Sequence, residues 1–208
     1  MLRPILFNTE MVRAILAGRK TETRRIVPVD KWGTLVRRRP YQIGDILWVR
    51  ETWDFLPCIV CRQDSECCEI APYQPDKMET ADGLTDGCFL YRADEEDPLA
   101  WRPVKWRPAI HMPKQAARIF LEVTKISRER LWDISETGAT AEGCYTGWKP
   151  TETSTPAASA RQAFMWDWQI VTRKGPVRQS WAANPWVWVI RFKRVIRPDG
   201  WPGCGEGS

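Results

Sequence analysis

Four apolar runs with the composition of β-strands constrain the fold of this chain more than any other feature. They lie at residues 5–7, 46–53, 118–126 and 186–192, and Val, Ile, Leu, Phe and Trp dominate them. The run at 46–53 alternates between two faces with the period of a strand. Helical patterns do not alternate with these runs as they do in parallel βαβ folds. The pattern predicts an α+β fold, a small and mostly antiparallel β-barrel with helices at its rim, because closure removes unpaired sheet edges.

The length and composition favour one domain with elaborations. With 208 residues, of which 43% are hydrophobic, the chain can bury one sizeable core, whereas two full domains would be cramped. We expect a single domain over residues 1–197, irregular insertions at 54–108 and 147–159, and a flexible glycine-rich tail at 198–208. No run of about 18 apolar residues exists, and the first residues do not form a signal peptide. These features predict a cytoplasmic protein without a membrane span, and they leave the oligomeric state open.

The seven cysteines are odd in number, which argues against a complete disulfide framework. Five of them fall in the first predicted insertion, and one pair there, Cys58 and Cys61, has the two-residue spacing of a zinc site. One interpretation is a zinc ion held by Cys58, Cys61, Cys67 and Cys88. The alternative is free thiols in an irregular loop, and we expect no other cofactor.

A strongly polar segment follows the first predicted helix. That helix ends at Gly18, and residues 19–25 then carry four cations, two hydroxyl groups and one carboxylate without a large apolar side chain. Such a segment is a poor part of a core. A rigid helix can aim a polar loop of this kind toward a ligand, so the segment is a candidate functional site. The alternative is a solvated basic surface.

Three motifs, in a fixed order, resemble the ASCH-domain family, and most closely its longer versions carried by phages and prophages. The resemblance covers most of the chain outside the two insertions and implies a PUA-like β-barrel. The motifs are Gly18-Arg19-Lys20-Thr21-x-Thr23-Arg24, Gly44-Asp45-x-Leu47-Trp48-Val49-Arg50-Glu51-Thr52, and Asp133-Ile134-Ser135 leading to Ala139-x2-Glu142-Gly143.

The resemblance also implies a function. Proteins of the PUA-like superfamily bind RNA or modified nucleobases in a cleft of the barrel, and one small bacterial ASCH protein hydrolyses N4-acetylcytidine. By motif position, the catalytic residues of that hydrolase correspond to Lys20, Thr23 and Glu142. The ligand-binding residues that we expect around them are Arg19, Arg24, Arg25, Arg50, Glu51 and Trp53.

The implied chemistry is consistent with these residue types. Amide hydrolysis needs a nucleophile, a proton acceptor and a group that directs the proton to the leaving amine. Thr23 offers a hydroxyl group, and a desolvated Lys20 among arginines would accept its proton at a lowered pKa. Glu142 would orient Lys20 or relay the proton. Residues three apart point to opposite faces of a regular strand, so Lys20 and Thr23 cooperate only if the chain turns or bulges between them.

The charge balance and the tryptophan content indicate the class of partner. The chain has 31 Lys and Arg against 26 Asp and Glu, a net charge of +5, and 13 tryptophans. Cations contact phosphates, and exposed rings stack on bases. We expect recognition of RNA, single-stranded nucleic acid or a modified nucleoside, with Lys20, Thr23, Arg24, Glu51 and Glu142 meeting in one cleft. The alternatives are an amidohydrolase of acylated nucleosides, a ribonuclease, or a site that only binds phosphate.

Overall fold

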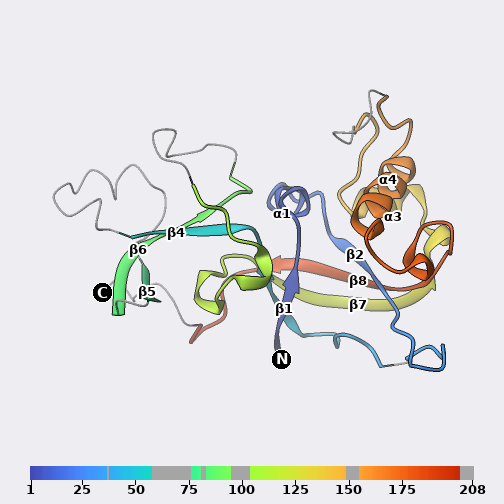
Figure 1. Cartoon of the computed structure of the whole chain (residues 1–208). Helices are drawn as coiled ribbons and strands as arrows, with labels where there is room; N and C mark the ends of the chain where they lie inside the picture. The colour runs from blue at the N-terminus through green and yellow to red at the C-terminus, as the bar shows by residue number, and fades with distance from the viewer. Residues whose placement is uncertain (37, 58–75, 81–82, 95–103, 149–154, 202–208) are drawn as a thin grey trace. The chain divides into compact units, whose positions relative to one another are not determined.

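The computed structural model describes residues 1–36, 38–57, 76–80, 83–94, 104–148 and 155–201 (Figure 1). The described elements confirm the predicted α+β class. The strands are β1 (Leu2–Leu6), β2 (Glu22–Ile26), β3 (Ile46–Arg50), β4 (Trp53–Pro57), β5 (Asp76–Thr80), β6 (Gly83–Tyr91), β7 (Phe120–Arg130) and β8 (Trp186–Val195). The α-helices are α1 (Thr9–Leu16), α3 (Glu136–Ala141) and α4 (Ala160–Thr172), and short 3-10 turns include η4 (Leu131–Asp133) and η5 (Val177–Gln179).

The four apolar runs contribute strands to one sheet, as predicted. Its order is β1-β3-β7-β8-β2, and β2 pairs antiparallel with β8. The sequence predicted a closed or nearly closed barrel, and the sheet is not closed: β1 and β2 are its two edges within the described part of the chain. The edge strand β2 is rich in charge, with Glu22, Arg24 and Arg25 among its five residues. Charged side chains on an edge disfavour further strand pairing, and an open edge is the result.

The chain divides into two compact units. The first contains residues 1, 14–46 and 121–194, and the second contains residues 2–13, 47–120 and 195–208. In the first unit, β7, β8 and β2 are consecutive neighbours, and α3 packs against α4. Its core includes a buried cluster of Leu131, Ile134, Ala139, Ala160, Phe164 and Val187.

The second unit contains a small antiparallel sheet with the order β4-β6-β5. This sheet lies almost entirely within residues 54–108, which the sequence predicted to be an irregular insertion. The rings of Trp53 and Phe55 pack on Phe89, with centroids 5.8 and 5.1 Å away. Trp201 contacts Phe120 and Trp48 edge to face, and so closes a second aromatic group in this unit.

Several sequence predictions fall outside the described residues. They concern Cys58, Cys61 and Cys67 of the predicted zinc site and most of the predicted tail. Cys88 lies in β6. In the described part of the chain, no helix combines the length and the apolar character needed to cross a membrane.

Candidate functional site

The polar site of the first unit begins where α1 ends. Gly18 has a φ of 71°, a left-handed conformation that glycine adopts without strain, and the chain turns back there. The main-chain N–H groups of Arg19 and Lys20 both donate to the Ala14 carbonyl, at 2.9 and 3.0 Å. The Thr21 N–H then donates to the Ala141 carbonyl at 2.8 Å. This turn places Lys20 against the end of α3, immediately before β2.

Helix α3 brings Glu142 to the same place. Ser135 caps its first turn by accepting a hydrogen bond from the Gly138 N–H at 3.0 Å, and Glu142 follows the last helical residue. Gly143 then has a φ of 95°. A Cβ atom at this residue would lie 3.3 Å from the Cβ atom of Lys20. The lack of a side chain at Gly143 therefore permits the close approach of the two segments.

Lys20 and Glu142 form a buried ion pair. The Lys20 Nζ donates to Glu142 Oε2 and also to the Glu142 carbonyl, the latter at 2.9 Å. The side chains of Lys20 and Glu142 are 0% and 4% exposed, respectively. Because desolvation penalises both charges, such a pair persists only when its partners are well placed. Lys20, whose side chain is fully covered, is the most deeply buried charge of the polar site.

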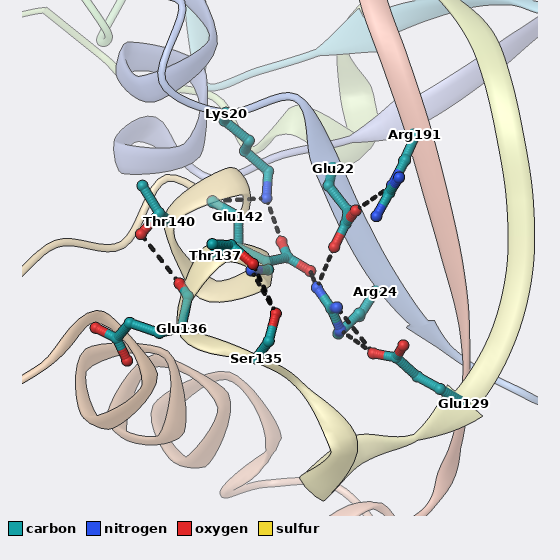
Figure 2. Close-up of polar contacts among 11 residues, drawn as sticks. Lys20, Glu22, Arg24, Glu129, Ser135, Glu136, Thr137, Thr140, Glu142 and Arg191 are labelled. Atoms are coloured by element: carbon teal, nitrogen blue, oxygen red, sulfur yellow. Dashed lines mark hydrogen bonds and ion pairs between the residues drawn. The ribbon is translucent and has the colours of Figure 1, made fainter.

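Arg24 holds the other oxygen of the same carboxylate (Figure 2). Its Nη1 lies 3.3 Å from Glu142 Oε1 and 2.8 Å from Glu22 Oε1. Its Nη2 lies 2.8 Å from Glu129 Oε1. Arg191 in turn lies 2.6 Å from Glu22 Oε2 and is 55% exposed. Three cations and three carboxylates thus form one network, which runs from the covered Lys20 to the exposed Arg191.

Burial lowers the pKa of Arg24, but the carboxylates of Glu142, Glu129 and Glu22 outweigh this effect, and the net pKa is raised. Arg24 therefore stays charged. For the neighbouring Arg25, burial dominates and lowers the pKa, although Glu142 and Tyr41 oppose the shift.

The remaining residues of the first motif have different surroundings. Thr23 is buried in β2 opposite Ile190, between Glu22 and Arg24. Because successive side chains of a strand face opposite sides, its hydroxyl group faces away from the side that carries Arg24 and Glu22. In the described part of the chain, no hydrogen bond joins Thr23 to Lys20 or Glu142.

Arg19 is exposed beside the buried pair. Its Nη1 donates to the Gly143 carbonyl at 3.1 Å, and its guanidinium group lies 5.5 Å from the ring centroid of Tyr145. Tyr145 is 50% exposed. Arg19 and Tyr145 together are called the Arg19–Tyr145 platform below.

The other three predicted ligand-binding residues, Arg50, Glu51 and Trp53, belong to the second unit and have partners there. Glu51 is 1% exposed and accepts two hydrogen bonds from Arg118, at 3.0 and 3.1 Å. Arg50 donates to the Ile110 carbonyl, and the ring of Trp53 lies under Arg107 at 5.0 Å. The structure gives these side chains packing and ion-pair contacts within that unit.

Of the five residues predicted to converge, the structure brings together Lys20, Arg24 and Glu142. Sequence reasoning missed Glu22, Glu129 and Arg191 as members of the network. The strand period was a signal for Glu22, since it lies two residues before Arg24 and so shares its face. Glu129 and Arg191 are distant in sequence, and only the pairing of β2 with β8, with Glu22 opposite Arg191, identifies the latter.

Among the residues that the structure describes, no group of three or more His, Cys, Asp or Glu side chains could hold a metal ion. Cys58, Cys61 and Cys67, three of the four residues of the predicted zinc site, lie outside this part of the chain.

The comparisons with known proteins gave one match. No protein-family model and no curated protein matches the sequence. Among solved structures, the chain is similar to a crystal structure from Lactobacillus crispatus, with 15% sequence identity and a TM-score of 0.41, over 94% of this chain and 80% of the other. That structure is an ASCH domain, the family that the three sequence motifs of this chain resemble.

Proposed function

We propose that the first unit recognises a nucleoside, free or within RNA or another single-stranded nucleic acid, at the Lys20–Glu142 contact. The observation that carries this proposal is the position of the exposed Arg19–Tyr145 platform directly beside the buried pair. A base stacks on an exposed tyrosine ring, and an arginine contacts phosphate. The platform supplies both groups next to a carboxylate and an ammonium group.

The buried pair suits the polar edge of a base. A carboxylate oxygen accepts a hydrogen bond from an exocyclic amino group, and an ammonium group donates to a ring carbonyl. Arg24 fixes the direction of the Glu142 carboxylate, which lowers the entropic cost of binding. Because Lys20 and Glu142 are covered, binding at this place requires that the pair exchange one of its mutual bonds for a bond to the base.

The test is titration of labelled single-stranded RNA, and separately of N4-acetylcytidine, at several salt concentrations. The RNA affinity should fall steeply with salt, because phosphate contacts release counterions. Arg19→Ala should weaken RNA binding about threefold to tenfold, as expected for one exposed contact of this kind. Arg178→Ala is the matched control, since it removes an exposed arginine near Ile26 and Trp186, at the end of β2 that lies away from Lys20. Absent binding of both ligands, or equal effects of the two variants, would contradict the proposal.

A second candidate function is hydrolysis of an acylated nucleoside such as N4-acetylcytidine. It is favoured by the way in which Lys20 and Arg24 each hold one oxygen of Glu142. A carboxylate held in this way can direct a water molecule toward the acyl carbon. The tetrahedral intermediate then loses the amine, which takes a proton, and the carboxylic acid is released. Since Thr23 faces the opposite side of β2, we favour water as the nucleophile.

Turnover assays with variants separate this second candidate from simple binding. If the reaction occurs, Glu142→Gln and Lys20→Met should each reduce kcat by roughly 100-fold, because each removes a group that acts in the transition state. Thr23→Val keeps the shape of the side chain and should leave kcat within about threefold if water attacks. Complete loss of turnover in Thr23→Val would instead indicate that the Thr23 hydroxyl group is the nucleophile. If the wild-type protein hydrolyses none of a panel of acylated nucleosides, the hydrolase function is rejected and only the binding function remains.

A further inference from the structure

A separate pocket lies at the other end of β2, in the same unit. Its volume is about 340 Å³, and it is called the Trp186 pocket below. Most of its wall is apolar, and the polar remainder consists of two arginines and one glutamine. The lining residues are Ile26, Val27, Pro28, Val29, Leu35, Ala183, Pro185 and Trp186, with Arg130, Arg178 and Gln179.

The walls of the Trp186 pocket are held by hydrogen bonds. On one side, Val29 and Leu35 form an antiparallel bridge, and the Asp30 carboxylate accepts from the main-chain N–H of Thr34 at 2.8 Å. On the other side, the Val27 N–H donates to the Trp186 carbonyl at 2.9 Å. A pocket built in this way exists before any ligand binds, as is usual for small-molecule sites.

One of the two arginines is also fixed in place. The Arg130 guanidinium group lies 4.6 Å from the ring centroid of Trp186 and donates to the Asn184 carbonyl at 3.1 Å. Asn184 has a φ of 45°, and its side-chain oxygen accepts a hydrogen bond from the main-chain N–H of Trp132 at 2.8 Å. Asparagine tolerates this left-handed conformation better than most residues. The conformation directs the main-chain carbonyl of Asn184 toward Arg130. Arg130 therefore presents its remaining N–H groups in a fixed direction.

The charge of the Trp186 pocket is positive. Neither Asp nor Glu is among its lining residues. Arg178 is exposed, and within the described part of the chain it forms no ion pair. Two guanidinium groups next to an apolar wall are complementary to a ligand that combines a flat apolar body with a negative group.

We propose that the Trp186 pocket binds a small aromatic anion, with its ring against the apolar wall and its carboxylate or phosphate monoester between Arg130 and Arg178. The volume is at the lower end of the range for small-molecule sites, which fits a ligand of one or two fused rings. A paired guanidinium contact fixes the anionic head, and ring burial supplies the remaining affinity. This inference depends on the Trp186 pocket alone and not on the Lys20–Glu142 site.

The test uses a matched pair of probes, naphthoate and its neutral counterpart naphthylmethanol. Binding is followed by NMR through the indole signal of Trp186 and the methyl signals of Val27 and Leu35. Naphthoate should bind about tenfold more tightly than naphthylmethanol, the difference expected for one charge-assisted contact. Arg178→Gln should abolish most of this preference, whereas Arg194→Gln, at an exposed arginine outside the pocket, should leave it unchanged.

Two further measurements sharpen the result. Ala183→Phe places a ring at an exposed lining position and should prevent binding of both probes without loss of folding. Naphthyl phosphate compared with naphthoate identifies the preferred anionic head, and tighter binding of either supports the proposal. Equal affinities of naphthoate and naphthylmethanol, no signal change at Trp186, or equal effects of Arg178→Gln and Arg194→Gln would overturn it.

Discussion

A Cβ atom on Gly143 would lie 2.7 Å from the Cβ atom of Ala14, closer than two such carbons approach in proteins. The contact joins the segment after α3 to the last turns of α1. Because Lys20 follows α1 and Glu142 precedes Gly143, this spacing sets the distance between the two partners of the buried ion pair. The geometry of the polar site thus depends on a residue without a side chain.

Gly143→Ala should therefore destabilise the protein. The added methyl group clashes with Ala14, and alanine is strained at a φ of 95°. We expect a loss of about 2 to 4 kcal/mol in the free energy of unfolding. Gly147→Ala is the matched control, because Gly147 has a φ of 90° but nothing within 4 Å of its Cβ position. Gly147→Ala should lower the free energy of unfolding only by the conformational strain, about 1 to 2 kcal/mol. Equal costs in denaturant unfolding would contradict the clash.

Lys20 and Glu142 should be strongly coupled in stability. Lys20→Met or Glu142→Gln alone leaves a buried charge with one partner fewer, at an expected cost of about 3 to 5 kcal/mol each. The double variant removes both charges of the pair and should cost clearly less than the sum. A double-mutant cycle in urea measures this difference. Additive costs would show that the contact contributes no coupling energy.

Arg24→Lys should fail to preserve the network although it preserves the charge. A planar guanidinium group reaches Glu142, Glu22 and Glu129 at once, whereas an ammonium group on a flexible stem cannot match this fork. We expect a loss of about 2 to 3 kcal/mol, within the range for hydrogen bonds to charged groups. Arg191→Lys is the control, since Arg191 is 55% exposed and contacts a single carboxylate. Its cost should be below about 1 kcal/mol.

Cys144 should be an unreactive thiol. Burial raises its pKa to about 12, and the carboxylates of Asp167 and Glu142 add to the shift. Only the thiolate reacts with alkylating reagents, so modification of Cys144 near neutral pH should be much slower in the folded than in the unfolded protein. Mass spectrometry of the peptide that contains Cys144 measures both rates. Similar rates in the two states would contradict the raised pKa.

The raised pKa of Cys144 also predicts that the folded protein becomes less stable as the pH rises above 9.0. Between the ordinary value of 9.0 and about 12, the unfolded chain loses the Cys144 proton while the folded chain keeps it. The contribution of this group to stability is therefore complete below pH 9.0 and is lost as the pH rises toward about 12. Cys144→Ala should flatten that part of the curve, and an unchanged slope in unfolding experiments at alkaline pH would argue against the shift.

Part of this arrangement follows from local sequence patterns. The runs at 46–53, 118–126 and 186–192 have strand composition, and the structure contains β3, β7 and β8 there. Gly18 indicates the end of α1 from the sequence alone, because glycine adopts the left-handed conformation at a helix end without strain. Sheet closure is a global property, and the charges of β2 argued against it only once β2 was known to be an edge.

The candidate site was predictable to a lesser degree. The resemblance to a family linked Lys20 with Glu142, and the structure places them in contact. Neither the composition nor the strand period of the sequence indicates that Glu51 forms an ion pair with Arg118. The two residues are 67 positions apart, and only the fold brings them together. Likewise, Glu129 enters the network only because β7 and β8 are neighbours, and β8 pairs with β2.

The main chain of Thr21 joins two elements. Its N–H donates to the Ala141 carbonyl, and its own carbonyl accepts from the Phe192 N–H at 2.9 Å. Its side chain is exposed. Position 21 therefore contributes through its peptide groups, and any side chain is compatible with it except proline, which lacks the donor. A fluorescent dye attached at this residue would sit next to Lys20 without replacing a contact of the network. The fold thus provides a reporter position from which ligand binding at the proposed nucleoside site would be read in real time.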